Sequence, residues 1–268
     1  MTALKNANTR ASGKRTYSWR NEEYWSVTTI IGGGIPKPAL LPWGIKMVAE
    51  GAADAAANGL LVPMVEQDRD GAIRWLKGLP YAKRDAAGDI GTLVHTWIEA
   101  HSLRKPMPKP PLPVKPYLEA FKAFTTDFDP AFTATEASVY NRTQSYAGTL
   151  DSICTLKLPL NDQPGTYILD AKSGKGVYPE VGLQLAAYRF AEFIGLPDGS
   201  EAPMPNVDGA LCLHLTPEGY KLIEVRADDE IYTAFLYARE VFRFCTDTSK
   251  TVLGLEYGPL AEPVGEAA

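Results

Sequence analysis

A proline-rich segment divides the chain into two parts of different character. Residues 105–116, with the sequence KPMPKPPLPVKP, contain six prolines. Proline fixes φ and lacks a backbone N–H, so this stretch is expected to be an extended surface connector rather than a helix or a central strand. Helical patterns precede it, and mostly strand patterns follow it. The sequence therefore predicts a mixed α/β protein with a helical N-terminal part.

The part before the connector contains three helical patterns and one strand pattern. Residues 37–57 are rich in alanine, and residues 68–79 and 89–103 are predicted to form two further helices. The last of these has apolar residues at i, i+3, i+4, i+7 and i+8, namely Ile90, Leu93, Val94, Trp97 and Ile98. Residues 24–31, YWSVTTII, are β-branched and aromatic and predict a strand that ends in a turn at the glycine run 32–34.

The part after the connector reads as one helix, a run of strands, and two further helices among them. The expected helices are 117–128, 182–194 and 228–245, and the expected strands are 134–140, 148–158, 166–171, 210–215 and 220–225. We expect a single domain over residues 16–255, with a helical N-terminal part to residue 128 and a catalytic core over 85–245. Residues 1–15 are expected to be a mobile tail, and residues 256–268 a C-terminal tail.

Composition limits the partners and the compartment. With 268 residues, 45% of them hydrophobic, the chain is long enough to bury a core, and no run approaches the ~18 apolar residues of a membrane span. The N-terminus has no apolar h-region, so no secretory signal is expected. The net charge is −5, from 27 basic and 32 acidic residues. A protein of this charge would bind nucleic acid through a local groove or with the help of a metal ion.

The cysteines indicate neither disulfides nor a metal cluster. Cys154, Cys212 and Cys245 lie far apart and form no CxxC pair. An odd, scattered set disfavours a disulfide framework and a Cys-ligated zinc or iron–sulfur cluster. The expected location is the cytoplasm.

The most informative polar residues lie in residues 167–174, YILDAKSG. An apolar strand ends in Asp170 and Lys172, which are two residues apart and therefore share a face. A D-x-K arrangement alone is expected by chance roughly once in a chain of this length. Asp151, in the stretch AGTLDSI, lies one strand earlier. If the two strands are antiparallel neighbours, the carboxylates of Asp151 and Asp170 converge at one edge of the sheet.

Two converging carboxylates repel each other, and a hard divalent cation is the commonest means of keeping both ionised. Mg²⁺ binds through one or two carboxylates together with water and substrate phosphates. A lysine beside such a site can orient a water molecule or stabilise charge that develops on phosphorus. On these two segments alone, an equally good interpretation is a pair of unrelated acids at turns.

Two helical features extend this set. Gln184 and Tyr188 are i, i+4 on the helix that follows the D-x-K strand, so they share a face, although a polar edge on a packed helix explains them as well. His95 lies among the apolar residues of its helix, where a lone histidine is more often a core residue than a ligand. Glu99 is four residues after His95 instead of one, which excludes the HExxH zinc-protease motif.

In chain order, these motifs resemble those of the PD-(D/E)XK nuclease superfamily. They are Gly91-x-x-x-His95, Gly148-Thr149-Leu150-Asp151, Asp170-Ala171-Lys172 and Gln184-x-x-x-Tyr188. More narrowly, the set resembles the RecB-type exonucleases, including CRISPR-associated RecB-like exonucleases and their phage relatives. Residues 26–30 and 37–40 are similar to phage members. The matched motifs span residues 91–188, and their order is more specific than any one of them.

The resemblance implies a restriction-endonuclease-like core, in which helices flank a central mixed sheet. It implies roles for seven residues: His95, Asp151, Asp170 and the Ala171 carbonyl as ligands of Mg²⁺ or Mn²⁺, Lys172 as the catalytic lysine, and Gln184 and Tyr188 as neighbours of the substrate strand. Glu136 is a weaker candidate, on the strand where some members carry an extra acid. The iron–sulfur members bracket the core with four cysteines that have no equivalents here, so no cluster is expected.

The function that this resemblance implies is a metal-dependent exonuclease. It would hydrolyse phosphodiester bonds from single-stranded or duplex DNA ends, in phage DNA replication or recombination, without a covalent enzyme intermediate. Two alternatives stay open. One is a catalytically inactive nuclease-fold module that binds DNA, and the other is a structure-specific or site-specific endonuclease of the same fold.

Two weaker signals complete the sequence picture. The glycine run 32–34 matches neither GxGxxG nor GxxxxGK[ST], so a turn is the preferred interpretation. Aromatic and basic residues of the N-terminal part are as consistent with core packing as with stacking on single-stranded DNA. They are Trp19, Tyr24, Trp25, Trp43 and Tyr81, with Arg15, Arg20, Lys37 and Lys46.

Overall fold

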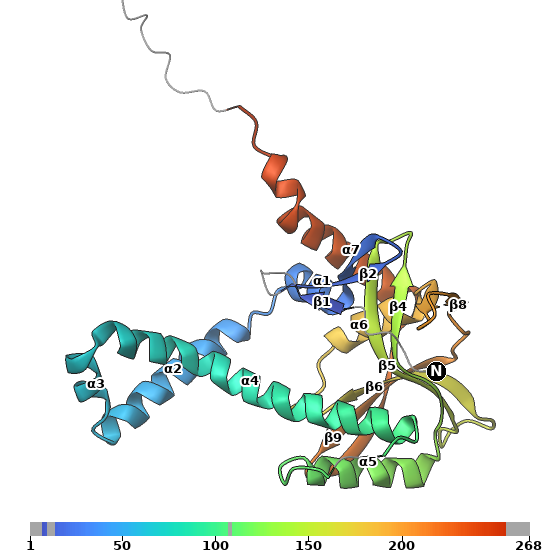
Figure 1. Ribbon diagram of the computed structural model, residues 1–268, viewed down its shortest axis with the longest axis horizontal. Helices are drawn as coiled ribbons and strands as arrows, with labels where there is room; N and C mark the ends of the chain where they lie inside the picture. Colours follow the sequence, from blue (N-terminus) through green and yellow to red (C-terminus); the bar gives the residue numbers. More distant parts are fainter. Residues whose placement is uncertain (1–6, 10–13, 107–108, 256–268) are drawn as a thin grey trace, which may run out of the picture.

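The computed structural model describes residues 7–9, 14–106 and 109–255 (Figure 1). Over these ranges it combines a ten-stranded mixed sheet with seven α-helices, which confirms the predicted mixed α/β class. The strands are β1 (Ala7–Thr9), β2 (Arg15–Trp19), β3 (Glu22–Ser26), β4 (Ala131–Asn141), β5 (Tyr146–Leu156), β6 (Gly165–Lys172), β7 (Phe193–Gly195), β8 (Glu201–Pro203), β9 (Gly209–Thr216) and β10 (Gly219–Val225). The helices are α1 (Val27–Gly34), α2 (Leu40–Ala57), α3 (Leu61–Gln67), α4 (Arg69–Ser102), α5 (Lys115–Phe128), α6 (Glu180–Arg189) and α7 (Asp229–Thr246), followed by the 3₁₀ turn η1 (Thr248–Thr251).

The centre of the sheet is formed by long strands in the order β4, β5, β6, β9 and β10. β5 is antiparallel to both β4 and β6, whereas β6 runs parallel to β9. β3 pairs with β5 in parallel and joins the β1–β2 hairpin strands to the central sheet. Most residues of β5, β6 and β9 are buried because both faces of the sheet are covered there.

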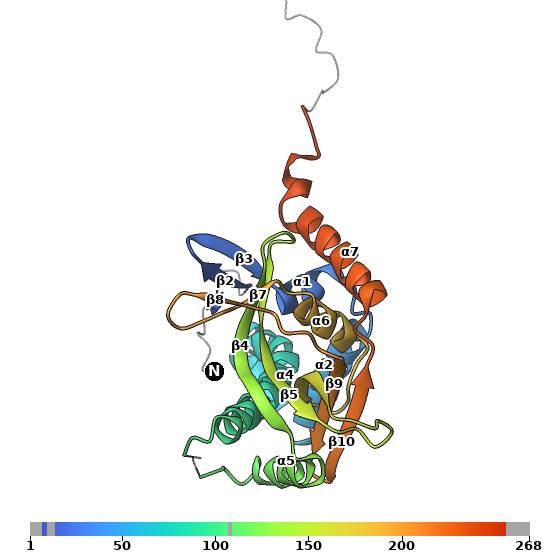
Figure 2. The ribbon, with the colours of Figure 1, turned by 90° about the vertical axis from the view of Figure 1, so that its right-hand side faces the viewer.

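Helices cover the two faces of the sheet with separate apolar cores. α1, α6 and α7 pack on one face, around Ile30, Leu185 and Phe235. α5 and the C-terminal half of α4 pack on the other, around Val94 and Phe124. Figure 2 shows α6 and α1 beside the upper part of β4 and β5, and α5 across the lower end of the sheet.

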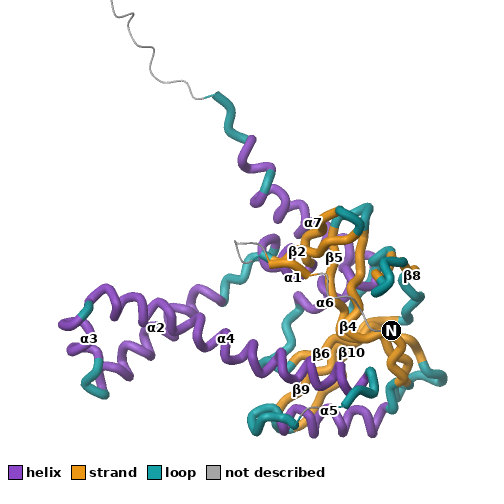
Figure 3. Tube along the Cα trace, viewed as in Figure 1, coloured by secondary structure: helices purple, strands orange, loops and turns teal. Residues whose placement is uncertain are grey.

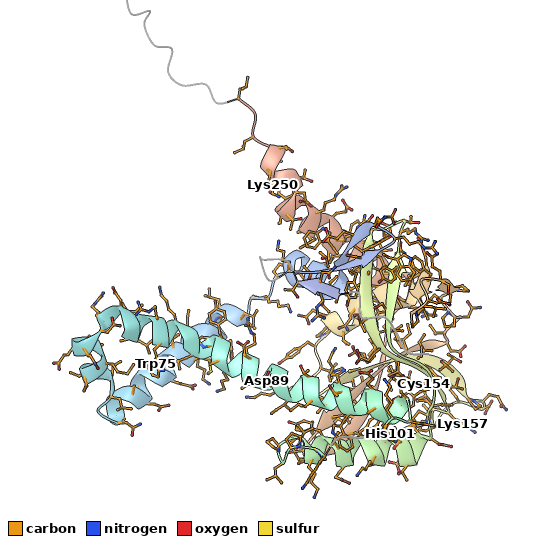
Figure 4. All side chains as sticks on the ribbon, in the orientation of Figure 1. Trp75, Asp89, His101, Cys154, Lys157 and Lys250 are labelled. Carbon is orange, nitrogen blue, oxygen red and sulfur yellow. The ribbon has the colours of Figure 1, made fainter. Side chains whose placement is uncertain are left out.

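A helical arm projects from this body. We define it as α2, α3 and residues 69–88 of α4, which continue away from the sheet (Figures 1 and 3). Figure 3 shows helices and loops alone in this part of the molecule. Figure 4 shows how α4 links the two regions, with Trp75 in the arm, Asp89 midway and His101 beside the sheet.

The expected strand at residues 24–31 is wrong in its second half. The strand ends at Ser26, and Val27–Gly34 form helix α1. The glycine run is therefore not a turn, and its role is close packing against α7. A Cβ on Gly34 would lie 2.1 Å from the backbone oxygen of Ala238, and one on Gly33 would lie 2.6 Å from the ring of Phe242.

The two helices expected at residues 68–79 and 89–103 are one continuous helix, α4. The intervening stretch, PYAKRDAAG, has no apolar stripe, but alanine, lysine and arginine favour a helix without burial. Asp68 caps the helix by accepting a hydrogen bond from Gly71 N at 2.8 Å. Of the predicted apolar stripe, Val94 and Ile98 are buried, whereas Leu93 is exposed.

Three further boundaries differ from expectation. The helix expected at 182–194 ends at Arg189, because Phe193–Gly195 form β7, which pairs with β4. Ala7–Thr9, expected in a mobile tail, form β1 and pair with β2. Helix α5 begins at Lys115, inside the expected connector. The expected C-terminal tail lies outside the described residues, as do residues 1–6, 10–13 and 107–108 of the other two segments.

Candidate metal and active site

The pairing of β5 with β6 brings two of the candidate acids together. The strands are antiparallel, as expected, and Ser152 pairs with Leu169 at the last registered position before Asp151 and Asp170. The two acids therefore follow at facing positions, on the same side of the sheet. Beyond this point, Ala171 N donates a hydrogen bond to Asp151 Oδ2 at 2.8 Å. The backbone of β6 thus holds the Asp151 carboxylate in place.

A cluster of three potential metal ligands surrounds Asp151. His95 Nδ1, on α4, lies 3.5 Å from Asp151 Oδ2 and 3.9 Å from Glu136 Oε1. One ligand atom from each of the three side chains can be chosen so that all lie within 4.8 Å of one another. One imidazole and two carboxylates form a donor set that fits Mn²⁺ well and Mg²⁺ through the oxygens.

Glu136 reaches this cluster through an unusual backbone conformation. Its φ is +49°, in the left-handed region, although it lies inside strand β4. The register on either side, Thr135 with Ser152 and Ala137 with Leu150, places Glu136 opposite Asp151. Non-glycine residues with positive φ are uncommon, and such strain gathers at functional sites. Glu136, the weaker candidate from the sequence, is thus a full member of the cluster.

Asp170 lies in a second, adjoining network with Lys172 and Gln184. Lys172 Nζ is 2.9 Å from Asp170 Oδ1 and 2.7 Å from Oδ2, and Gln184 Nε2 donates to Oδ1 at 2.9 Å. The Asp170 side chain is almost fully buried, yet its Oδ2 accepts no well-directed hydrogen bond from the described residues. The Lys172 ammonium group neutralises this oxygen without a well-directed hydrogen bond, so Oδ2 keeps a lone pair that a metal ion could take.

Burial and charge set the protonation of this pair. Burial, with a further contribution from Asp151, raises the pKa of Asp170 to about 6, against the opposing effect of Lys172. Burial by itself would lower the pKa of Lys172, but the negative charges of Asp170 and Asp151 outweigh it and raise that pKa. Lys172 is therefore a cation at neutral pH. It can orient a nucleophile or stabilise anionic charge, and it is not a general base.

Gln184 and Tyr188 hold the back of the site. They share one face of α6, and Gln184 Nε2 lies 3.4 Å from Tyr188 Oη. Tyr188 is buried against Gly148, where a Cβ would lie only 2.4 Å from the tyrosine ring. Burial raises the pKa of Tyr188 well above its ordinary value, so its hydroxyl stays protonated. Gly148 thus gives Tyr188 the space to approach the strand that carries Asp151.

A pocket of about 210 Å³ opens beside Lys172 and Gln184. Its other walls include Thr28 of α1, Lys37 of the α1–α2 linker and Tyr178 of the loop after β6. His214 Nε2 lies 2.8 Å from Gly174 O and so anchors that loop. The pocket gives a substrate access to the Asp170–Lys172 pair from the side of α1.

The structure brings most of the candidate residues into one place. His95, Asp151 and Glu136 form the ligand cluster, while Asp170 lies beside it in the Lys172–Gln184 network. Ala171 is buried, and its N–H contacts the Asp151 carboxylate. Thr28 and His214 also lie near the site, although no sequence motif indicated them. His214 reaches this place because β9 pairs in parallel with β6, which sets His214 beside Lys172.

The aromatic residues of the N-terminal part separate into two groups. Trp19 and Tyr24 are buried around Tyr140 in a small core beneath β2 and β3. Trp19 and Tyr24 are therefore core residues, and their rings are not exposed for stacking on single-stranded DNA. Trp43 and Tyr81, in contrast, line a groove in the helical arm.

Comparisons with known proteins assign no family. No family model and no curated protein matches the chain. A solved structure titled "Crystal structure of SSO0001" is 15% identical and covers 70% of this chain and 71% of that chain, with a TM-score of 0.28. That likeness is too low to indicate a function. No helix in the described ranges combines the length and the apolar character needed to cross a bilayer.

Proposed function

We propose that this protein is a metal-dependent deoxyribonuclease, an exonuclease that hydrolyses phosphodiester bonds at DNA ends. The observation that carries the proposal is the His95–Glu136–Asp151 cluster directly beside the buried Asp170–Lys172 pair. The motif order that resembles PD-(D/E)XK nucleases of the RecB type points the same way. A role in phage DNA replication or recombination follows from that resemblance.

The chain provides a site of suitable chemistry for Mg²⁺ or Mn²⁺. His95, Glu136 and Asp151 would hold the ion. Asp170 Oδ2, which is ion-paired with Lys172 but accepts no well-directed hydrogen bond, would complete the set. Such an ion, when bound, lowers the pKa of water and polarises a phosphoryl oxygen. Because the negative charges of Asp170 and Asp151 repel each other, a cation between the two carboxylates would also relieve that repulsion.

The remaining residues position the reactants. The charged Lys172 Nζ, fixed by Asp170 and Gln184, donates to the attacking water or to the phosphate as negative charge develops. The water oxygen forms a bond to phosphorus while the bond from phosphorus to the leaving sugar oxygen breaks. Gln184 contacts both Asp170 and Tyr188, and these contacts hold the Asp170 carboxylate and Lys172 in their relative positions.

Digestion of end-labelled DNA tests the proposal. Single-stranded and duplex substrates are incubated with Mg²⁺, Mn²⁺ or EDTA, using the native chain, Lys172→Ala and the control Lys157→Ala. Lys157 is exposed, directly follows the last residue of β5 outside the site, and is labelled in Figure 4. We expect metal-dependent release of label, reduced about 100-fold or more by Lys172→Ala and unchanged by Lys157→Ala.

Other results would point to the alternatives. DNA binding without cleavage under every metal condition would contradict the proposal and favour a non-catalytic DNA-binding module. Cleavage of closed circular DNA would favour an endonuclease. Calorimetric Mn²⁺ titration gives a second readout, because Asp151→Asn removes a charged ligand and should weaken metal binding roughly 10-fold or more.

A further inference from the structure

A second, larger cavity lies in the helical arm. It is a groove of about 790 Å³ between the first half of α2 and the middle of α4. Apolar side chains of α2, among them Leu41 and Ile45, form one wall, and Lys77, Tyr81 and Arg84 of α4 form the other. Leu41 is 72% exposed and Tyr81 60% exposed, so these side chains face solvent rather than a core. We call this cavity the arm groove.

The groove residues of α4 share a helix face with a metal-site residue. Lys77, Tyr81 and Arg84 precede His95 by 18, 14 and 11 residues, which are close to whole numbers of 3.6-residue turns. Between them this face carries Gly88, where an added Cβ would meet nothing within 4 Å. At Gly88 the helix face between the groove and His95 is therefore open.

The α1–α2 linker also connects the groove to the active site. Lys37 lines the pocket beside Lys172, and Leu40, three residues later, already lines the arm groove. The two cavities thus lie at the two ends of one short segment of chain. An extended ligand that follows residues 37–40 from the pocket beside Lys172 would reach the groove.

The chemistry of the groove matches a single strand of nucleic acid. Aromatic faces suit stacking of bases in any sequence, and Trp43 and Tyr81 supply them. Among the described residues that line the groove, the charged ones are the cations Lys77 and Arg84. Arg84 lies 5.2 Å from the Tyr81 ring centre and also bonds Asp85, so Lys77 is the more available cation for a phosphate.

We propose that the arm groove binds a single strand of DNA whose end lies in the metal site. This inference rests on the proposed nuclease function. Bases of the strand stack on Tyr81 and Trp43, and its phosphates contact Lys77 and Arg84. The helix face shared with His95 and the cationic side chains of the groove favour this occupant over an apolar segment of a protein partner.

The geometry sets a minimum length for the strand. Tyr81 and His95 are 14 residues apart on one helix, or about 21 Å at ~1.5 Å per residue. At ~3.4 Å per stacking step this distance is about six steps, so a stacked strand needs about seven nucleotides to reach both places. A tetranucleotide can therefore occupy the metal site alone, whereas a 16-nucleotide strand can also fill the groove.

Fluorescence anisotropy with labelled oligothymidylates of 4 and 16 nucleotides, in EDTA to prevent hydrolysis, tests the groove. We expect the native chain to bind the longer strand at least 10-fold more tightly. Tyr81→Ala and Lys77→Glu should each remove 5-fold or more of that preference, because they delete a stacking surface or a phosphate contact. Lys77→Glu should also lower the salt slope by about 1.

Two exposed residues provide matched controls. Lys83→Glu makes the same charge change on α4 but off the groove face, and Tyr237→Ala removes an exposed aromatic ring from α7. Both should retain the full length preference. Lys77 and Tyr81 are exposed, so thermal unfolding of their variants should match the native chain. Lys77→Ala and Arg84→Ala repeat the test if either variant does not fold.

The outcomes separate this inference from the proposed function. Cleavage of the tetranucleotide with Mn²⁺ reports on the metal site alone and should be unchanged in the groove variants. A length preference that survives in both groove variants overturns the groove assignment, even if cleavage is normal. If no oligonucleotide is cleaved but the variants lose the preference, the nuclease proposal fails and the groove assignment stands. A loss of oligomeric mass with Tyr81→Ala in light scattering shows a protein contact and overturns it.

Discussion

The sheet body and the helical arm differ in which side chains they bury and which they expose. In the body, Asp170 is 1% exposed and is held by the ammonium group of Lys172 and the side-chain amide of Gln184. In the arm, α3 has no buried residue, and the one buried residue of α2 is Ala55. Leucine and tyrosine side chains there lie open to solvent. Charged groups are thus buried in the sheet body, and apolar side chains are exposed in the arm.

This difference separates two tasks. In the proposed function, the groups that act on a phosphate must keep their relative positions, and those on β4, β5, β6 and α6 are fixed by packing and strand pairing. Groups that only need to hold a ligand can lie on helices whose hydrogen bonds are internal. Regions with few buried contacts also open at lower free energy than the core does. The arm should therefore be the less stable of the two regions.

The largest expected contrast is in cysteine reactivity. Burial raises the pKa of Cys154 and of Cys212 to about 12 from 9, which cuts their ionised fraction about a thousandfold. Thiolates are the reactive form, so at pH 8 a disulfide reagent should label exposed Cys245 rapidly and the buried pair only after unfolding. Spectroscopic counting of released thiolate measures this.

Engineered thiols extend the same test to the arm. In a Cys245→Ser background the rapid phase should vanish, and adding Leu41→Cys, in the arm groove, should restore it. A rapid phase that persists in Cys245→Ser would contradict the burial of the body. The folded pKa values also have a stability consequence. The stabilisation from the two protonated thiols is complete below pH 9 and is lost as pH rises from 9 towards 12, because the unfolded chain ionises first.

Two glycine substitutions should change stability in opposite directions. Gly148→Ala places a Cβ 2.4 Å from the Tyr188 ring, in a packed part of the body, and should lower the free energy of unfolding by about 1–3 kcal/mol. Gly78→Ala, on α4 in the arm, meets nothing within 4 Å and should raise local helix stability by about 0.5–1 kcal/mol. Urea unfolding with helix-sensitive and tyrosine-sensitive signals measures both.

The glycine pair also separates packing from helix propensity. If Gly148→Ala is neutral, Tyr188 can move away from β5 at no cost, and its place beside Gln184 is not fixed by packing. If Gly78→Ala destabilises the chain, the arm is more tightly packed at that position than the open surroundings of Gly78 indicate.

The smallest expected effect concerns the start of α4. Asp68 accepts a hydrogen bond from Gly71 N and lies 3.2 Å from Arg74, so Asp68→Ala should cost about 1 kcal/mol. Because the loss is local, amide hydrogen exchange should accelerate about 5-fold in the first turns of α4 and stay unchanged in β5 and β6. Asp70→Ala is the control, since Asp70 is exposed and lies 4.0 Å from Arg69. A uniform acceleration across the sheet would mean that the arm and the body unfold together.

Features that depend on neighbouring residues could be predicted from the sequence. The strands around Asp151 and Asp170 are apolar runs bounded by turn residues, and the i, i+2 spacing of Asp170 and Lys172 places them on one face by strand geometry alone. The i, i+4 spacing of Gln184 and Tyr188 does the same on a helix. These local periodicities hold wherever the element lies in the fold.

Features that depend on distant contacts could not be predicted in this way. Residues 27–34 are as suitable for a strand as for a helix, and packing of the glycines against α7 decides in favour of the helix. The central place of Glu136 depends on its positive φ, for which a glutamate gives no sequence signal. Likewise, the distance between His95 and Asp151 is set by how α4 crosses the sheet, which no local pattern encodes.

Helix α4 is anchored to the sheet body at its C-terminal end. Its C-terminal part is clamped by the buried side chains of Val94 and Ile98, and this part carries His95. Pro80, which has no N–H to donate to Leu76, lies 15 residues before His95, about 22 Å away. Because one helical hydrogen bond is missing at Pro80, α4 is expected to bend most easily there. Bending at Pro80 would therefore move the outer arm and leave His95, a ligand in the proposed metal site, in place.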